Sequence, residues 1–239
     1  MASMSGDVPA AKRRAEEALA LARELADAWG VAEALWTLGY LLVEEGRSEE
    51  AQPLIEDGLR RFEELGDDHH ALLATRTLAF AYTETGDLER ARVLHEENLE
   101  RARALGNMQV QVPTLGALAM VAVEQGRFDD ALSLLRENVP IAIAVGNRAP
   151  LAVNLCRVAH AFAAAGRADA AARLLAALEE PLVEIGGGGP WVTVMNEQTL
   201  GLVRGRLDND ALAAAREQGR ALSFDDAVEL ALAELGQAE

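Results

Sequence analysis

Apolar residues recur at helical spacing in this chain, and no stretch shows the alternating Val, Ile and Thr pattern of a β-strand. Over residues 8–29 the apolar positions form one face of a helix; they are Ala15, Ala18, Leu19, Ala22, Leu25, Ala26 and Trp29. A last helix is expected to begin at Ser223 and to bury a second stripe: Phe224, Ala227, Val228, Ala231, Leu232 and Leu235. The pattern predicts an all-α protein.

Glycine divides the chain between these stripes into equal intervals. Two glycine series each repeat every 40 residues and are offset by 20: Gly46, Gly86, Gly126 and Gly166, then Gly66, Gly106, Gly146 and Gly186. Each interval holds one helix of about 15 residues and a short turn, in which glycine supplies the left-handed conformation that ends a helix. A strict period in this range is typical of stacked supersecondary units. We therefore expect about twelve helices, arranged as helical hairpins, and no sheet.

Small residues and candidate caps follow the same period. Alanine lies five residues after each glycine of the first series, at Ala51, Ala91, Ala131 and Ala171. Such small residues are expected where two helices cross closely. Ser48, Asp87 and Asp129 follow glycines of the first series, where side-chain caps of the next helix are expected. Ser223 and Asp226 form an approximate capping box.

The repeating unit resembles the tetratricopeptide repeat. The matching positions are Leu38, Gly39, Gly46 and Ala51 in the first unit, and Leu78, Ala79, Tyr82, Gly86 and Ala91 in the second. The 40-residue period is longer than the usual 34, as in the variety seen in kinesin light chains and bacterial signalling regulators. HEAT and armadillo arrays share the length but lack this signature. The resemblance implies a right-handed superhelical solenoid of stacked helical hairpins.

Three regions are expected along the chain. Ala15 and Gly30 have the spacing of Ala51 and Gly66, so residues 1–30 are interpreted as a partial repeat from a longer array or as an N-terminal capping helix. Residues 31–186 hold the four 40-residue repeats. The run Gly186–Gly189 followed by Pro190 cannot continue a helix. Residues 187–239 then form a degenerate fifth repeat, with helices near 191–203 and 208–218, and a C-terminal capping helix.

The C-terminal region carries a second resemblance. Residues 213–223, continuing to 232, resemble the end of large actinobacterial regulators of the LuxR type with a STAND-class ATPase, and of related nucleotide cyclases. Arg216 stands where that family usually has tryptophan. The resemblance implies that this chain is the sensor or interaction arm of a larger regulator. The ATPase, cyclase and DNA-binding parts are not in this sequence.

Charge and cysteine content narrow the classes of partner. The chain has 39 acidic and 22 basic residues and a net charge of −17, which disfavours direct binding to nucleic acid or to anionic membranes. The single cysteine excludes an internal disulfide and suits a reducing cytosol. No apolar run reaches the length of a membrane span, and the first residues lack a signal-peptide layout. We expect a cytoplasmic protein.

The resemblance implies that the first helix of each repeat lines a concave groove. Positions 40 residues apart then form columns. The central column is Tyr40, Phe80, Met120 and His160; one turn earlier lie Trp36, Arg76, Gly116, Cys156 and Asn196; one turn later lie Glu44, Glu84 and Glu124. Large apolar side chains in such columns can bind a partner, or they can simply pack between repeats. The glutamates either form a solvated face or select a basic partner.

Other candidate chemistry is weaker. Cys156 and His160 share a helix face, but zinc needs at least three protein ligands and no second cysteine is available. A nucleophile and base at this spacing would also lack oxyanion donors. We therefore expect no metal and no cofactor. The leading interpretation is a non-catalytic domain that binds a protein or peptide, and self-association through the N-terminal helix is a further expectation. The alternatives are a small-molecule effector sensor, with polar groups converging around Arg76 and Asn196, and an enzyme on a helical scaffold.

Overall fold

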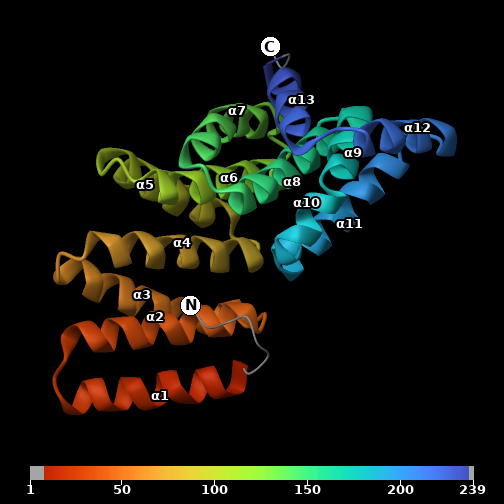
Figure 1. The fold of residues 1–239 in the computed structure, drawn as a ribbon. Helices are drawn as coiled ribbons and strands as arrows, with labels where there is room; N and C mark the ends of the chain where they lie inside the picture. Colours follow the sequence, from red (N-terminus) through yellow and green to blue (C-terminus); the bar gives the residue numbers. More distant parts are fainter. Residues whose placement is uncertain (1–7, 237–239) are drawn as a thin grey trace. The chain divides into compact units, whose positions relative to one another are not determined.

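The computed structural model describes residues 8–236, which form thirteen α-helices, one short 3₁₀-helix and no strand (Figure 1). The expected all-α fold is confirmed. The chain folds as two compact units, Met1–Leu105 and Gly106–Glu239. Within the described residues no helix has the length and apolar character needed to cross a membrane.

Unit 1 consists of five helices that pack in chain order. Each helix contacts the next, and α2 also contacts α4 (Figure 1). Ile55, Phe62 and Leu72 are fully buried in its core. The helices are α1 (Val8–Glu24), α2 (Ala28–Glu44), α3 (Ser48–Glu64), α4 (Asp68–Glu84) and α5 (Leu88–Ala104).

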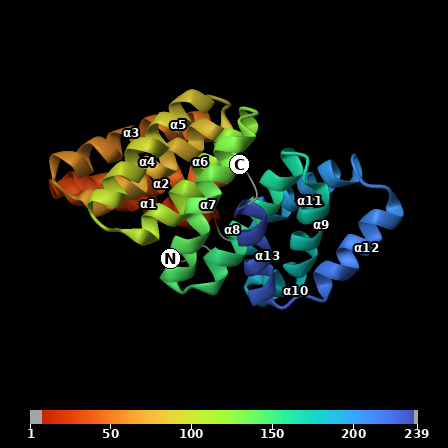
Figure 2. The ribbon, with the colours of Figure 1, turned by 90° about the horizontal axis from the view of Figure 1, so that it is seen from above.

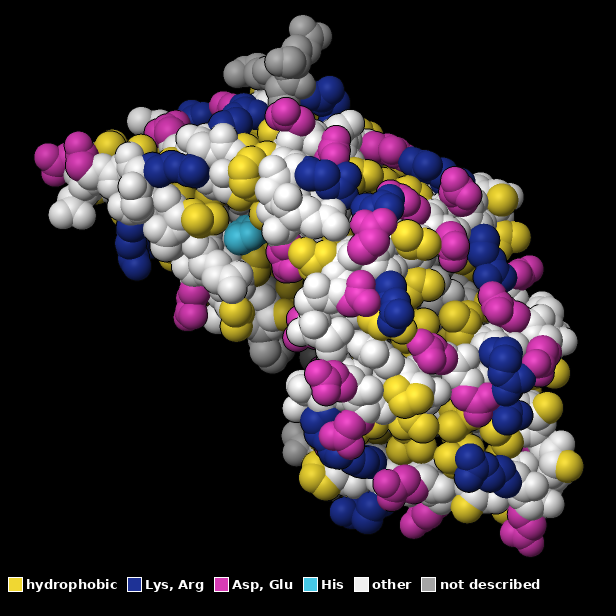
Figure 3. All heavy atoms as spheres, turned by 180° about the vertical axis from the view of Figure 1, so that it is seen from behind, with side chains coloured by type: hydrophobic (Ala, Val, Ile, Leu, Met, Phe, Trp, Pro, Cys, Tyr) yellow, Lys and Arg dark blue, Asp and Glu magenta, His cyan; other side chains and the backbone are white. Residues whose placement is uncertain are grey.

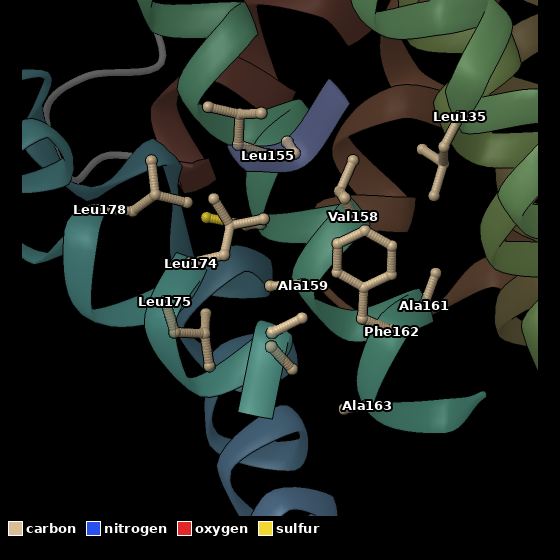
Figure 4. Close-up of a cluster of buried hydrophobic side chains, with 14 of the residues drawn as sticks. Leu135, Leu155, Val158, Ala159, Ala161, Phe162, Ala163, Leu174, Leu175 and Leu178 are labelled. Carbon is tan, nitrogen blue, oxygen red and sulfur yellow. The ribbon is translucent and has the colours of Figure 1, made fainter. Parts of the chain in front are cut away.

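Unit 2 is less regular. Its main core lies around α8 and α9, where large aliphatic side chains surround Phe162 (Figure 4). Its elements are α6 (Met108–Glu124), α7 (Phe128–Val145), α8 (Arg148–Ala164), α9 (Ala168–Ala177), α10 (Glu179–Glu184), the 3₁₀-helix η1 (Gly186–Gly188), α11 (Pro190–Arg204), α12 (Asn209–Arg220) and α13 (Phe224–Gly236).

The end of unit 2 departs from a simple continuation of the stack. The helix α12 packs on α9, and α13 lies against α7, α8 and α9 (Figure 2). Glu234 of α13 is ion-paired with Arg167 and Arg173, and Arg136 Nε donates to the Leu235 carbonyl at 2.9 Å. The helix α13 therefore covers earlier helices of its own unit. The predicted capping box is confirmed, since the Asp226 N–H donates to Ser223 Oγ and the Ser223 N–H to Asp226.

Both glycine series have the predicted conformation. All eight glycines have φ between 63° and 91°. The position 40 residues before Gly66 is Ala26, which adopts φ 51° without being glycine. The helix expected over residues 8–29 therefore ends at Glu24, and Gly30 lies in the first turn of α2. Pairing Ala15 with Gly30 as a repeat boundary was wrong, because alanine occupies the left-handed turn here.

The predicted caps are correct in one case of three. Asp87 accepts a hydrogen bond from the Arg90 N–H, as expected. Ser48 and Asp129 were wrong, because both lie inside helices whose N-cap residues, Arg47 and Arg127, make no side-chain cap. The structure instead shows a capping column with the same 40-residue period, at the start of α2, α4, α6 and α8: Asp27, Asp67, Asn107 and Asn147.

Candidate partner-binding face

Helices α2 and α4 place equivalent repeat positions side by side in unit 1. Both begin at an aspartate cap, and the Trp36 Nε1–H donates to Thr77 Oγ1 at 3.1 Å across the pair. Because α2 contacts α4, residues 40 apart in sequence are neighbours on one surface. We call this surface the α2–α4 face. Its members are the six unit 1 residues of the predicted columns: Trp36, Tyr40, Glu44, Arg76, Phe80 and Glu84.

The centre of the α2–α4 face is aromatic and open to solvent. Tyr40 and Phe80 are each 39% exposed, whereas Trp36 is half-buried. Burial and the adjacent Glu44 carboxylate raise the pKa of Tyr40, and the Arg76 guanidinium acts in the opposite direction. Burial lowers the pKa of Arg76, which is half-buried. The face therefore combines two accessible rings with charged groups on either side.

The corresponding positions of unit 2 are more enclosed. Met120 on α6 and His160 on α8 are half-buried, and Glu124 is exposed. His160 Nδ1 lies 2.9 Å from Thr199 Oγ1 of α11, and burial lowers the pKa of His160. The half-buried Asn196 places its Nδ2 3.8 Å from the sulfur of Cys156.

Cys156 does not line a surface. Its side chain is fully buried, and burial raises the pKa of the thiol to about 12. At neutral pH it is therefore a protonated, enclosed thiol that offers a partner no surface. Placing Cys156 among the lining residues was wrong, because this position of α8 faces the core of unit 2. Across residues 8–236 no cluster of three or more His, Cys, Asp or Glu side chains is arranged to hold a metal.

Gly116 has a packing role in unit 2. A Cβ at this position would lie 2.6 Å from Arg157 Nη1. The Arg157 guanidinium fills that space, donates to Asn154 Oδ1 at 2.8 Å and lies 4.8 Å from the centre of the Trp191 ring. The glycine of α6 in this column thus makes room for an arginine of α8.

Comparison with known proteins agrees with this architecture. The model of the MalT-like TPR region matches residues 1–230. The chain belongs to the MalT-like TPR region family. Among curated proteins, none matches it.

Solved structures similar to this MalT-like TPR chain share its fold. BtubC (BKLC) from P. vanneervenii superposes with a TM-score of 0.67 at 20% identity, covering 97% of this chain and 94% of that one. Two structures of a putative kinesin light chain from Podosopora anserina with nearly identical TPR-like repeats give TM-scores of 0.57 and 0.58. Their identities are 17% and 16%; the first covers 84% of this chain and 88% of its own, the second 91% and 90%. These likenesses concern the fold.

Two hollows of the MalT-like TPR chain lie outside the predicted columns. One, of about 320 Å³, is lined by residues of α3, α4 and α5: Glu56, Leu78, Tyr82, Glu89, Arg90, Val93, Leu94 and Glu97. There the Tyr82 hydroxyl donates to Glu56 Oε1 at 2.7 Å. Sequence reasoning treated Tyr82 only as a repeat signature. Another, of about 310 Å³, lies along α1 and α2 beside the exposed Leu21 and Leu25.

The surface of the MalT-like TPR chain mixes charges. On the face drawn in Figure 3, acidic and basic side chains are interspersed with hydrophobic ones. In unit 1 several acidic and basic side chains of the same helix form ion pairs, such as Arg60 with Glu64 in α3 and Arg92 with Glu96 in α5. No basic stripe that could follow a phosphate backbone is visible on the described part of this face.

Proposed function

We propose that this chain is a non-catalytic module that binds a peptide segment of a partner protein on the α2–α4 face. TPR-like repeats are typically scaffolds for protein interaction. The observation that carries the proposal is the pair Tyr40 and Phe80, two aromatic side chains on neighbouring helices that are each 39% exposed. We further propose that the module acts in the cytoplasm as the regulatory arm of a larger signalling or transcription regulator.

The energetics favour these two rings as anchors. Burying a large apolar side chain contributes about 1.5–3 kcal/mol, and aromatic anchors commonly dominate binding energy. Glu44 and Glu84 lie one turn beyond the rings and are exposed. They are suited to attract a basic group of the partner, with an association rate that falls as salt is added.

The test of this proposal compares two double variants of the full chain. Combining Tyr40→Ala with Phe80→Ala should weaken the binding free energy of a peptide for the chain by about 3 kcal/mol or more. Leu65→Ala combined with Leu105→Ala is the matched control, because these residues are also 40 apart and are 46% and 53% exposed, at the ends of α3 and α5. Melting curves establish that each variant is folded. Equal affinity of the folded aromatic variant and the wild type would refute the proposal.

A small-molecule effector is the second candidate, and one observation in unit 2 favours it. The Oδ1 atom of Asn196 is buried and has no hydrogen-bond partner among the described residues. A ligand donor placed beside Asn196 and His160 would satisfy this oxygen. An effector that raises the melting temperature of the wild type, but not of Asn196→Leu, would favour this function.

Self-association is a separate part of the proposal. Leu21 of α1 and Leu25, the residue that follows α1, are 56% and 67% exposed beside the hollow of α1 and α2. A second copy of the chain would cover this apolar surface with the same surface of its own. Light scattering should show concentration-dependent dimers that Leu25→Glu reduces. A strict monomer at high concentration would contradict this.

A further inference from the structure

Arg76 is the half-buried arginine of unit 1 that has no ion pair among the described residues. Three further arginines there are half-buried, and each is ion-paired: Arg61 with Asp57, Arg92 with Glu89 and Glu96, and Arg101 with Glu63 and Asp68. Arg76 is equally half-buried, yet no carboxylate among residues 8–236 lies within ion-pair distance of it, and it makes no hydrogen bond within that range.

This isolation is unusual in so acidic a chain. The sequence has 39 acidic residues against 22 basic ones. Glu44 and Glu84 lie on the same face, but within residues 8–236 neither forms an ion pair with Arg76. The Tyr40 hydroxyl, which would attract the guanidinium in its ionised form, is neutral at neutral pH because its pKa is raised. A guanidinium that is partly removed from water without a counter-ion is costly. The Arg76 guanidinium lies on the same face as the accessible rings of Tyr40 and Phe80, so a ligand that covers the rings could also supply the missing anion.

We propose that Arg76 pairs with a carboxylate of the bound peptide, either an acidic side chain or the C-terminal carboxylate, next to an apolar residue that covers Tyr40 and Phe80. This inference rests on the proposed function and specifies the chemistry of its ligand. Arginine offers a carboxylate two parallel N–H donors, and the rings supply the apolar contact. The peptide thus carries an acidic group beside an apolar anchor.

A carboxylate fits this site better than a phosphate group does. The site has a single guanidinium, and two exposed glutamates lie on the same face. Their repulsion acts twice as strongly on a dianion as on a singly charged carboxylate. A phosphate group would be matched by several basic residues, which the α2–α4 face does not have.

The experiment selects peptides on the full chain and then tests one of them. A random dodecapeptide phage library is enriched on the wild type and depleted on the Tyr40→Ala, Phe80→Ala variant, so that binders of the α2–α4 face remain. The most enriched peptide is synthesised with its acidic group and as the amide analogue. We expect the amide to bind the wild type about 10- to 100-fold more weakly, as for loss of a hydrogen bond to a charged group.

Matched variants separate the Arg76 contact from a general charge effect. On Arg76→Gln, acid and amide peptides should bind with affinities within about threefold of each other. Arg23→Gln removes an exposed arginine of α1 with the same change in net charge. On this variant the amide peptide should still bind about 10- to 100-fold more weakly than the acid peptide. Arg76→Lys should recover only part of the preference, because lysine lacks the paired donors.

The remaining outcomes distinguish the two proposals. Enriched peptides without an acidic group, an acid preference that persists in Arg76→Gln, or tighter binding of a phosphoserine analogue would overturn the carboxylate assignment. In each of these cases binding through Tyr40 and Phe80 would still support the proposed function. A library that yields no peptide dependent on the two rings would overturn both.

Discussion

Gly39 of α2 packs closely against α3, and this contact allows a quantitative test of the packing. A Cβ built on Gly39 would lie 2.3 Å from Ile55 Cγ1 and 3.3 Å from the Ala51 carbonyl oxygen. Real Cβ atoms do not approach other atoms so closely, so Gly39→Ala must displace Ile55. Overpacking of this kind costs about 1–3 kcal/mol.

An opposing term must be subtracted. Replacing glycine by alanine inside a helix gains about 1 kcal/mol. Gly39→Ala should therefore destabilise the chain by up to about 2 kcal/mol. Gly201→Ala in α11 is the matched control, since a Cβ there meets nothing within 4 Å. That variant should gain up to about 1 kcal/mol.

The equivalent crossing of a later repeat suggests a compensating change. There Ala119 and Leu135 occupy the positions equivalent to Gly39 and Ile55, and both are fully buried. Leucine is not branched at Cβ, so this pair leaves room for the alanine methyl group. Ile55→Leu should restore most of the stability lost in Gly39→Ala. Urea unfolding followed by circular dichroism at 222 nm measures all four chains. Equal stabilisation by Gly39→Ala and Gly201→Ala, or no recovery in the double variant, would refute this packing argument.

Three further predictions concern a turn, a cap and the cysteine. Ala26→Gly should stabilise the chain by about 1 kcal/mol, because alanine in the left-handed conformation is strained; an unchanged melting temperature would contradict this. Asp67→Ala should cost about 0.5–2 kcal/mol at neutral pH through loss of the cap on α4. Burial opposes ionisation of Asp67, but hydrogen bonds from Trp29 and His70 lower its pKa overall. The stability that Asp67 contributes is therefore fully present above the unfolded pKa of about 3.9 and is lost as the pH falls through the lower folded value. The denaturation curves of the wild type and Asp67→Ala should converge in acid. The Cys156 thiol should react with a disulfide reagent only after unfolding, since it is buried with its pKa raised to about 12; labelling of the native chain within minutes would contradict this.

Much of the fold could be predicted from the sequence because a turn needs a specific backbone conformation. Glycines in both series marked the helix ends, and their positive φ values confirm it. The end of the first helix was misplaced because Ala26, and not a glycine, occupies the left-handed turn there. The backbone conformation of the repeat is kept at this position, but no glycine marks it in the sequence. The capping column at Asp27 and Asp67 was present in the sequence at the same period, and was missed because capping was sought only after the first glycine series.

The candidate site could be predicted only in part. Helical periodicity correctly placed Tyr40 and Phe80 at equivalent positions of neighbouring helices. It could not distinguish their 39% exposure from the complete burial of Cys156, because burial depends on which helices pack around each position. The lack of an ion pair at Arg76 likewise follows from three-dimensional neighbours. The role as an arm of a larger regulator stays a prediction.

The most direct test of the central claim is photo-crosslinking from the α2–α4 face itself. Benzoylphenylalanine replaces Phe80 in one sample and Leu65, at the end of α3, in another, and each is irradiated with a peptide selected on the wild-type chain. Both positions are exposed, so the two probes differ chiefly in which surface they report. We predict a crosslinked product from position 80 and none from position 65. A product from position 65 with none from position 80 would contradict the assignment of the α2–α4 face as the partner-binding surface.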